Sequence, residues 1–339
     1  MAYIAMVHDI AGVAPVQARI LREAGHEVDE IRLPDFGARW GWWAKALTFP
    51  IRLLFYIPTI VRLRRRGYDV IHIHWVPRGV VGLLAQRPFL IQAHGSDLHK
   101  EIDVPALFTL NRWVLERARI IFYVTPNLAA FIRRFDEKLR YLPNPINVAA
   151  IADAPRPPFR VRRVIIFMRL DPIKGVEKVF PAVERLAGMV ELTALAWGPL
   201  AAEYRARYEG LVQFVEPVPH DRIGDFLDQF DLVVGQMEQG ALGLSEVEAM
   251  AAGKPVICGI DRSFYYSKDK PPVVFSGNPD ELVEQIEALK DDTKRLANLS
   301  HEGREWVRRN HGYERHLQLL EEAYFGERAP LASRTPIAM

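Results

Sequence analysis

Short apolar runs alternate with helical patterns along the whole chain. In the first half, six runs have the apolar or alternating character of strands, at residues 3–10, 26–34, 68–76, 88–97, 119–127 and 140–147. Six more follow in the second half, at residues 163–170, 190–197, 211–218, 231–236, 254–260 and 271–276. Helical patterns separate the later runs, at residues 175–187, 220–230, 244–252, 279–290, 293–309 and 312–325. Strands that alternate with helices predict parallel sheets with helices on both faces.

The segment "ADAPRPPFRVRR" separates the two series of strands. Its prolines, Pro155, Pro157 and Pro158, predict a stiff, extended connector. We therefore expect an α/β protein of two Rossmann-like doubly wound domains that face a central cleft, where a ligand binds. The expected parts are an N-terminal domain, a Pro-rich linker, a C-terminal domain, a helix that packs back on the N-terminal domain, and a flexible tail, at residues 1–152, 153–163, 164–310, 311–326 and 327–339.

Composition narrows the classes of function. Charged residues make up 25% of the chain and the formal net charge is +2, so the charge balance gives no reason to expect nucleic acid as a partner. Cys258 is the single cysteine, which excludes an internal disulfide and fits a reducing compartment. The N-terminal "MAYIAMVHDIAG" has no basic residue before its apolar run, so we expect a strand there and not a signal peptide.

Two cationic residues follow the first strand of the second half, in "MRLDPIKG". Arg169 and Lys174 lie just beyond that strand, and Gly175 opens the next helix. A guanidinium, an ammonium and the free N–H groups of a helix start together favour a diphosphate. A solvated basic loop is the alternative.

The stretch "GALGLSEVEAMAAGKPVICG", residues 240–259, is a second candidate anion site. Gly240 and Gly243 let the backbone approach a ligand just before a helix starts. Glu248 lies among small residues and could accept hydrogen bonds from a ribose, while Glu246 is expected to be a bystander. The alternative is that both glutamates are solvent-facing acids of the first turn. Residues two positions apart point in different directions on a helix, so at most one of them is expected to face a ligand.

These two motifs resemble the donor-binding domain of the GT-B glycosyltransferases, and most closely the large retaining family that includes sucrose synthases and mannosyl- and glucosyltransferases. "HGSDL" at 94–98, "VTPNL" at 124–128 and "LPNPIN" at 142–147 are similar to landmarks of that family's N-terminal domain, in the same order. The resemblance covers about residues 3–325. It implies a GT-B fold and a transferase that moves a sugar from a UDP- or GDP-linked donor with retention, by front-face attack, and without a metal ion or cofactor.

The resemblance also implies roles for residues of the C-terminal domain. Arg169 and Lys174 correspond to residues that hold the donor diphosphate and stabilise the charge of the leaving group. Glu248 matches the second glutamate of a paired-glutamate motif, which binds the ribose. Gly243 and Leu244 would offer backbone N–H groups to phosphate or sugar.

Gly240 departs from the family pattern. It stands where the first glutamate of the paired motif contacts the donor sugar. Glu238 or Glu246 could substitute for that glutamate. The departure leaves two alternatives to sugar transfer, namely a non-catalytic nucleotide-sugar-binding scaffold and a nucleotide-sugar epimerase.

In the N-terminal domain, the resemblance implies that His94 lies near the anomeric centre and acts in catalysis. Asp97 and Asn144 would lie close to the sugar or the acceptor. Gly12 lies in the first loop, which meets the diphosphate in the family, although "HDIAGVAP" is poorer in glycine than the usual turn.

A metal site is the other interpretation of the histidines. His72, His74 and His94 could cluster as ligands on adjacent strands. No cysteine lies nearby and the chain has no HExxH pattern. We therefore expect packed or hydrogen-bonded histidines at the strand ends, and no metal.

Residues 36–68 contain no acidic residue but many basic and aromatic ones. Pro50 and Pro58, and the cations that interrupt the apolar run, argue against a helix that spans a membrane. Tryptophans and cations beside apolar surface suit the headgroup region of an anionic membrane, and a buried helix pair is the alternative. We expect a cytoplasmic protein, peripheral on the inner face of the membrane, that acts on a lipid-linked or membrane-surface acceptor. The expected membrane contacts are Trp42, Trp43, Arg62, Arg64, Arg65 and Arg66.

Overall fold

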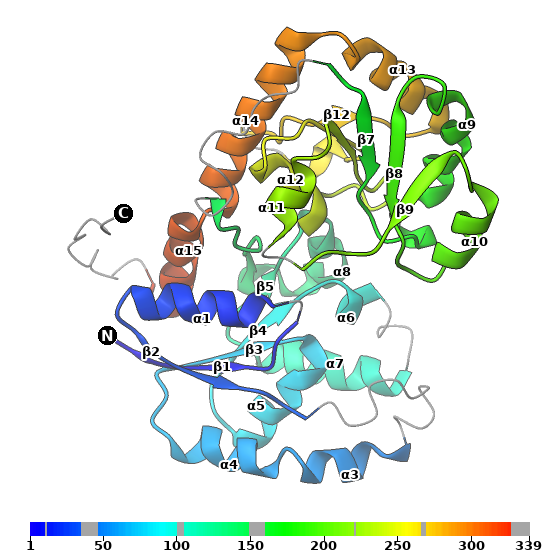
Figure 1. Ribbon diagram of the computed structural model, residues 1–339. Coiled ribbons are helices and arrows are strands. Elements are labelled where there is room, and N and C mark those ends of the chain that lie inside the picture. The colour runs from blue at the N-terminus through cyan, green and yellow to red at the C-terminus, as the bar shows by residue number, and fades with distance from the viewer. Residues whose placement is uncertain are drawn as a thin grey trace. The chain divides into compact units, whose positions relative to one another are not determined.

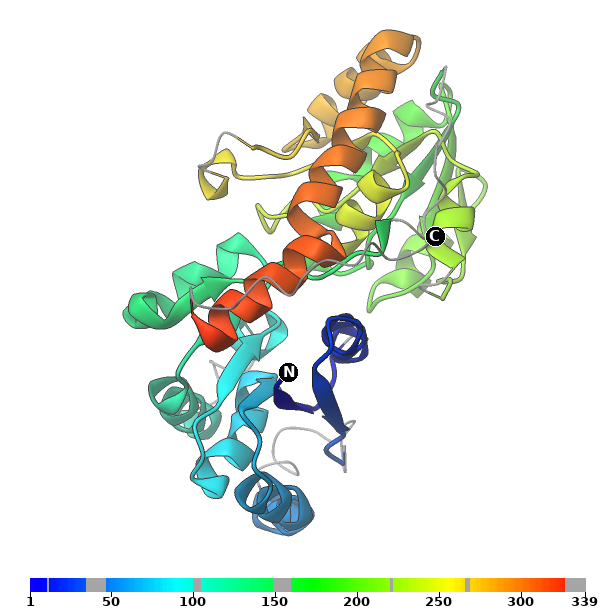
Figure 2. The ribbon, with the colours of Figure 1, turned by 90° about the vertical axis from the view of Figure 1, so that its left-hand side faces the viewer.

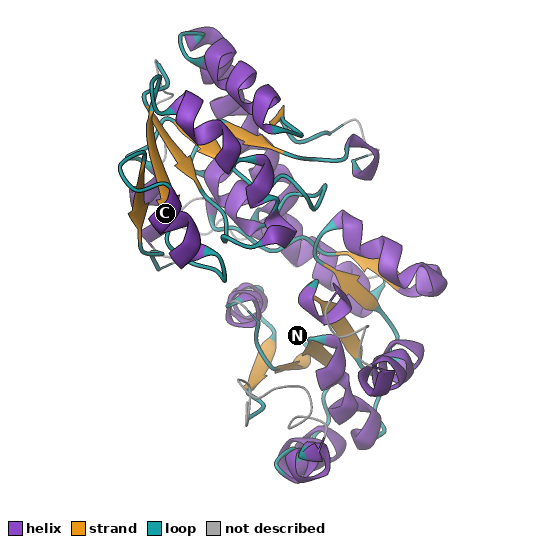
Figure 3. Ribbon diagram, turned by 90° about the vertical axis from the view of Figure 1, so that its right-hand side faces the viewer, coloured by secondary structure: helices purple, strands orange, loops and turns teal. Residues whose placement is uncertain are grey.

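The computed structural model describes residues 1–10, 12–34, 47–99, 105–148, 160–219, 222–265 and 269–326. The chain forms two compact units. Unit 1 consists of Met1–Pro145 and the C-terminal segment that begins at Tyr313, and unit 2 is Ile146–Gly312. Each unit contains a parallel sheet with helices on both faces (Figure 3). This arrangement confirms the predicted fold class of two Rossmann-like domains.

The sheet of unit 1 has the strand order β2-β1-β3-β4-β5-β6. Every strand overlaps a run predicted from the sequence, and the bounds are Tyr3–Val7 (β1), Glu27–Ile31 (β2), Val70–His74 (β3), Leu90–Ala93 (β4), Ile121–Tyr123 (β5) and Leu139–Tyr141 (β6). Met6 of β1 lies opposite His72 of β3, and His74 of β3 lies opposite Gln92 of β4. The register therefore gathers polar side chains at the carboxyl ends of the central strands.

Helices cover both faces of this sheet. The bounds in unit 1 are Val13–Glu23 (α1), Phe49–Leu54 (α3), Ile57–Arg65 (α4), Val80–Ala85 (α5), Ser96–His99 (α6), Pro105–Arg117 (α7), Ala129–Ile132 (α8) and Tyr313–Phe325 (α15). α1 and α15 lie side by side on one face (Figure 1), where Leu21 and Leu320 pack with Phe122. α4, α5 and α7 cover the other face, where Leu63 and Val114 pack with the opposite side of the strands.

The sheet of unit 2 has the strand order β12-β11-β10-β7-β8-β9. Its strands are Arg163–Ile166 (β7), Glu191–Leu195 (β8), Val212–Val215 (β9), Leu232–Val234 (β10), Val256–Cys258 (β11) and Val274–Phe275 (β12). Its helices are Val183–Leu186 (α9), Ala201–Arg207 (α10), Ile223–Leu227 (α11), Leu244–Ala251 (α12), Pro279–Leu289 (α13) and Thr293–His311 (α14). All six predicted runs of the second half thus contain a strand.

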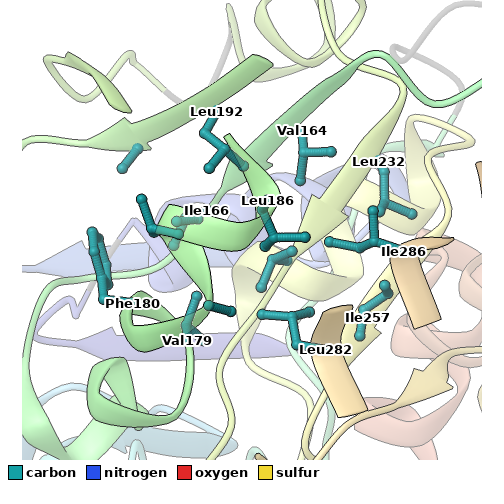
Figure 4. Close-up of a cluster of buried hydrophobic side chains, with 14 of the residues drawn as sticks. Val164, Ile166, Val179, Phe180, Leu186, Leu192, Leu232, Ile257, Leu282 and Ile286 are labelled. Atoms are coloured by element: carbon teal, nitrogen blue, oxygen red, sulfur yellow. The ribbon is translucent and has the colours of Figure 1, made fainter. Parts of the chain in front are cut away.

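Alternate strand residues of unit 2 face two hydrophobic cores. On one side, Val164 and Ile166 pack with Phe180, Leu186 and Ile286 below α9 and α13 (Figure 4). On the other side, the strands pack against α11, α12 and α14. α14, the long orange helix in Figure 2, packs directly on α12 and so fixes the helix that begins at the candidate anion site.

The structure differs from two of the segments predicted from the sequence. The helix predicted at 175–187 is broken into short 3₁₀ turns, Val176–Lys178 and Phe180–Ala182, before α9, because Pro181 cannot donate a helical hydrogen bond. Val161, assigned to the linker, is fully buried in the core of unit 2, and its N–H donates to the backbone carbonyl of Lys290. Trp42 and Trp43, most of the Pro-rich connector and the tail at 327–339 lie outside the described residues.

Candidate functional site

The loops after β7 and β10 bring the two sequence motifs of unit 2 together. β7 and β10 are neighbours in the sheet, and parallel strands end at the same edge. The N–H of Met237 donates to the carbonyl of Lys174 at 2.8 Å. Gly175 has a φ of 74°, and a Cβ on it would lie 3.0 Å from the backbone nitrogen of Glu238. Glycine therefore lets the two loops approach this closely.

The Lys174 ammonium lies between these loops, beside the start of α12. Its Nζ donates to Oε1 of Gln239 at 2.7 Å, and a Cβ on Gly243 would lie 3.7 Å from it. Burial lowers the pKa of Lys174, Glu246 opposes this shift, and the nearby Arg169 lowers the pKa further. A bound anion would offset the free-energy cost of burying the Lys174 ammonium. It would also weaken the repulsion between the two cations.

The Arg169 guanidinium faces the same strand end. Its Nη2 forms an ion pair with Oδ2 of Asp171 at 2.6 Å, and the group lies 6.0 Å from the ring centroid of Trp197. Nε is buried and has no hydrogen-bond partner among the described residues. A buried donor without an acceptor costs free energy, so Arg169 has hydrogen-bonding capacity that an anion could use.

The carboxylate of Glu246 holds the loop between β10 and α12. Its Oε1 accepts from the N–H of Gln236 and its Oε2 from the N–H of Gly243, both at 2.8 Å. The carboxylate thereby makes one half of a capping box at the start of α12, since Glu246 accepts from the N-cap N–H while Gly243 has no side chain to return the bond. Glu246 is 2% exposed and Glu248 is 9% exposed, so the alternative of solvent-facing acids is wrong for both. Glu246 is also no bystander, because it fixes the loop.

The bond between the Gly243 N–H and Glu246 changes which backbone groups can reach a ligand. The N–H of Gly243 is used by Glu246, so the predicted contact of this N–H with phosphate or sugar is not supported. The N–H of Leu244 has no hydrogen-bond partner within the described part of the chain and stays a candidate. Glu248 lies further along α12, and its contact with a ribose stays a prediction.

Gly240 occupies a position built for glycine. Its φ is 69°, in the left-handed region, and a Cβ on it would lie 3.0 Å from Cε2 of Phe264. The two glutamates considered as substitutes have other contacts. Glu238 pairs with Lys178 at 2.6 Å, and Glu246 caps α12. The loop conformation therefore requires glycine at position 240, where the family has a glutamate.

Two family models match this chain. The model described as glycosyl transferase 4-like domain matches residues 2–145, and the model described as glycosyl transferases group 1 matches residues 156–306. The chain belongs to the GT-B glycosyltransferases. The resemblance expected from the sequence motifs is thereby confirmed. No curated protein matches the chain at a significant level.

Solved structures of other glycosyltransferases and related enzymes share this fold at low sequence identity. Sucrose-phosphate synthase from Thermosynechococcus elongatus has a TM-score of 0.73 at 18% identity, and the match covers 96% of this chain and 98% of that chain. HepE from Anabaena, in complex with UDP and glucose, has a TM-score of 0.71 at 15% identity, with 95% and 99% covered. The catalytic domain of starch synthase IV from Arabidopsis thaliana, bound to ADP and acarbose, has a TM-score of 0.66 at 12% identity, with 96% and 98% covered.

In unit 1 of this GT-B glycosyltransferase, histidines line the ends of β3 and β4. Nδ1 of His74 lies 3.1 Å from Nε2 of His94, and Nε2 of His74 lies 3.1 Å from Sδ of Met6. His72 contacts the Tyr324 hydroxyl at 2.6 Å and stacks on His74. The histidines are thus packed and hydrogen-bonded, as expected. Over the described ranges, no group of three or more His, Cys, Asp or Glu side chains is arranged to hold a metal ion.

These histidines are held neutral. Burial lowers the pKa of His72 to about 3 and the pKa of His94 to about 3, and burial also lowers the pKa of His74 well below its usual value. His72 and His74 are fully buried, whereas His94 is partly exposed. His94 therefore presents a neutral ring with one hydrogen to share, and not an imidazolium.

Asp97 shapes the loop that carries His94. Its Oδ1 accepts from the N–H groups of His94 at 3.0 Å and Gly95 at 2.9 Å, and its Oδ2 accepts from Val76 at 3.0 Å. Burial raises the pKa of Asp97 to about 6 despite these bonds. Asp97 lies close to His94 as predicted, but it is fully buried and its oxygens are occupied by the backbone.

Gly12 and Asn144 lie in other loops of unit 1. Gly12 has a φ of 74° and precedes α1, and its N–H donates to Oδ2 of Asp9 at 3.2 Å. Asn144 is partly exposed in the loop after β6. Their contacts with the diphosphate and the sugar stay predictions.

The role of Gln236 was not predicted from the sequence. This side chain is fully buried, and its Oε1 accepts from the N–H groups of Glu238 at 3.1 Å and Gln239 at 2.7 Å. Its Nε2 donates to the carbonyl of Ala241 at 2.6 Å. A polar residue directly after an apolar strand was the available signal, because ligand loops begin at the carboxyl ends of parallel strands.

We predict that Glu246→Gln destabilises the protein by about 2 kcal/mol, because one backbone N–H would face an amide N–H₂ and lose its acceptor inside the core. Urea unfolding at neutral pH measures this loss. Glu238→Gln is the matched control, since Glu238 lies in the same loop but is half exposed in an ion pair, and its effect should stay within about 0.5 kcal/mol. Equal free energies of unfolding for the two variants would contradict the role given to Glu246.

Proposed function

We propose that the protein is a retaining hexosyltransferase that moves a sugar from a UDP- or GDP-linked donor to a lipid-linked or membrane-surface acceptor, without a metal ion or cofactor. The observation that carries the proposal is the position of the Lys174 ammonium, beside the start of α12 and close to Arg169. Two cations there would neutralise charge on a leaving nucleoside diphosphate, the task that metal ions perform in other transferases.

In the proposal, three groups of unit 2 together neutralise the charge of the leaving diphosphate. Lys174 acts as a point charge, and the unpartnered Nε of Arg169 offers a directed hydrogen bond. The N–H of Leu244 and the positive end of the α12 dipole add to the field at the phosphates. Glu248 is proposed to accept two hydrogen bonds from the ribose hydroxyls.

The carboxylates of the candidate residues in each unit are occupied, which fits front-face attack. Glu246 accepts from two backbone N–H groups, Asp171 pairs with Arg169, and Asp97 is fully buried. None of these three is placed to act as a nucleophile on a sugar. In the proposed step the acceptor oxygen bonds to the anomeric carbon on the face from which the diphosphate leaves, and the acceptor proton passes to a phosphate oxygen.

The neighbouring structures support a nucleotide-sugar donor. HepE was solved with UDP and with UDP-glucose, and starch synthase IV with ADP. These ligands belong to those proteins, and different bases occur among them. A donor screen therefore has to identify the base for this chain.

A run of exposed apolar residues in unit 1 supports contact with a membrane surface. α3, α4 and the residues beside them expose large apolar side chains that belong to Leu47, Ile51, Leu54, Phe55, Ile57 and Val61. Leu54 is 61% exposed, although it lies within a helix. Six exposed apolar side chains within fifteen residues favour a partner, and the arginines at the end of α4 favour an anionic one. No helix in the described ranges has the length and apolar character needed to cross a membrane.

The arginines of this segment fall into two groups. Arg62 and Arg66 bind Oδ2 of Asp29, at 2.6 and 3.0 Å, so they help to hold the end of α4 on the sheet. Arg64 and Arg65 are exposed and form no ion pair with any described residue. Because anionic lipids are enriched in the cytoplasmic leaflet, we propose that the enzyme is peripheral on that inner face, with Arg64 and Arg65 toward the lipids.

We predict that a panel of sugar nucleotides contains at least one donor that the wild type binds and cleaves, with release of the nucleoside diphosphate. Lys174→Ala should lower kcat by about a hundredfold or more, because a charge that meets the leaving group is lost. Arg169→Lys should also lose activity, since an ammonium cannot replace the directed guanidinium bond. Chelation by EDTA should leave the rate unchanged.

Lys178→Ala is the control for this experiment. Lys178 is an exposed neighbour of Lys174 that pairs with Glu238, so its removal should leave kcat within about twofold of the wild type. Binding of a donor without transfer to membrane lipid extracts would favour the scaffold. A changed sugar nucleotide formed without any acceptor would favour the epimerase. No binding of any donor would reject the donor site.

We predict that the wild type floats with vesicles that contain anionic lipid and stays unbound with purely zwitterionic vesicles. Arg64→Gln combined with Arg65→Gln should weaken binding by about thirtyfold, at about 1 kcal/mol for each arginine near the surface. Leu54→Glu combined with Ile57→Glu should abolish flotation. Leu211→Glu, at an exposed leucine of unit 2, is the control and should float normally. A wild type that never floats would show that the apolar segment serves another purpose.

A further inference from the structure

The contacts of His74 determine which of its ring nitrogens carries the hydrogen. The sulfur of Met6 has no hydrogen to give, so Nε2 of His74 donates across their 3.1 Å contact. A neutral imidazole carries one N–H, and burial keeps His74 neutral. Nδ1 of His74 is therefore an acceptor.

The same reasoning extends to His94. Its Nε2 lies 3.1 Å from Nδ1 of His74, and two acceptors cannot share this contact, so Nε2 of His94 donates. His94 is surrounded by His8, His74 and the buried Asp97. Burial, together with the charge of His8, lowers the pKa of His94 to about 3. The single hydrogen of His94 is thus on Nε2, which leaves a lone pair on Nδ1.

Nδ1 of His94 is available to a ligand. It has no hydrogen-bond partner among the described residues, and it is not one of their buried unpartnered atoms. His94 is partly exposed, in contrast to the fully buried His72 and His74. The free nitrogen can accept a hydrogen bond but cannot donate one.

We propose that Met6 and His74 are positioning residues that fix His94 as a hydrogen-bond acceptor, with its Nδ1 open to a hydroxyl group of a ligand. The identity of the ligand rests on the proposed function, whereas the relay from Met6 through His74 does not. Hydroxyl groups are the ligands that this nitrogen selects. A carbonyl, an ether oxygen or a fluorine at the same place would meet a lone pair and be rejected.

His316 offers an internal comparison in the same unit. Its Nε2 lies 3.0 Å from the Gln17 amide nitrogen, which is a donor, and its Nδ1 lies 2.9 Å from the carbonyl of Pro143. His316 therefore carries its hydrogen on Nδ1, the opposite tautomer to the one assigned to His94.

Nitrogen-15 NMR of the full chain with labelled histidine tests the relay without any substrate. Long-range proton–nitrogen correlations distinguish protonated from unprotonated ring nitrogens, and His94→Asn and His316→Asn assign the two signals. At neutral pH we expect His94 with an unprotonated Nδ1 and His316 with an unprotonated Nε2. A hydrogen on Nδ1 of His94, or a doubly protonated ring, overturns the proposal.

Met6→Leu tests whether the relay matters for the reaction. The swap conserves volume but removes the sulfur, so we expect the NMR signals of His94 to show both tautomers and kcat/KM for the cleaved donor to fall about fivefold, the size of one neutral hydrogen bond. Met189→Leu, in unit 2, is the matched control and should change neither. An unchanged tautomer in Met6→Leu overturns the role of Met6. If no donor is cleaved at all, the proposed function fails, while the NMR result still decides the relay.

Discussion

The buried carboxylate of Glu246 is the constraint on which the candidate site of unit 2 depends. It joins the N–H of Gln236, at the end of β10, to the N–H of Gly243, at the start of α12. Hydrogen bonds to a charged group are each worth about 1.5–3 kcal/mol, and here both lie inside the protein. Because the carboxylate is fixed, the helix begins where the Lys174 ammonium lies. The carboxylate also offsets part of the desolvation that Lys174 suffers.

The candidate functional groups are charged in unit 2 and neutral in unit 1. Unit 2 holds two cations, Arg169 and Lys174, near one another at a helix start. Their mutual repulsion favours the binding of an anion. Unit 1 buries a row of histidines that burial holds neutral, and it directs one of them through hydrogen bonds. Two neighbouring cations suit an anionic ligand, whereas neutral imidazoles suit an uncharged polar one.

The fold could be predicted from the sequence because the period of apolar residues marks each buried strand, and a strand lies in all twelve runs. The site was predicted in part. The sequence predicted that Arg169, Lys174 and the start of α12 lie close together, and the structure places them at one edge of the sheet. It did not predict that Glu246 accepts from the N–H of Gly243, because this bond depends on how the chain turns back between β10 and α12. The contact of Arg62 with Asp29 joins residues 33 positions apart, which local charge patterns cannot reveal.

Lys174, Arg169 and the start of α12 are proposed to form a site for a diphosphate. Calorimetric titration of the wild type with nucleoside diphosphates and the matching monophosphates measures it most directly. We expect the diphosphate of the preferred base to bind at least about tenfold more tightly than the monophosphate, and Lys174→Ala to remove most of that difference. Equal affinities in the wild type, or a preference that Lys174→Ala leaves intact, would contradict it.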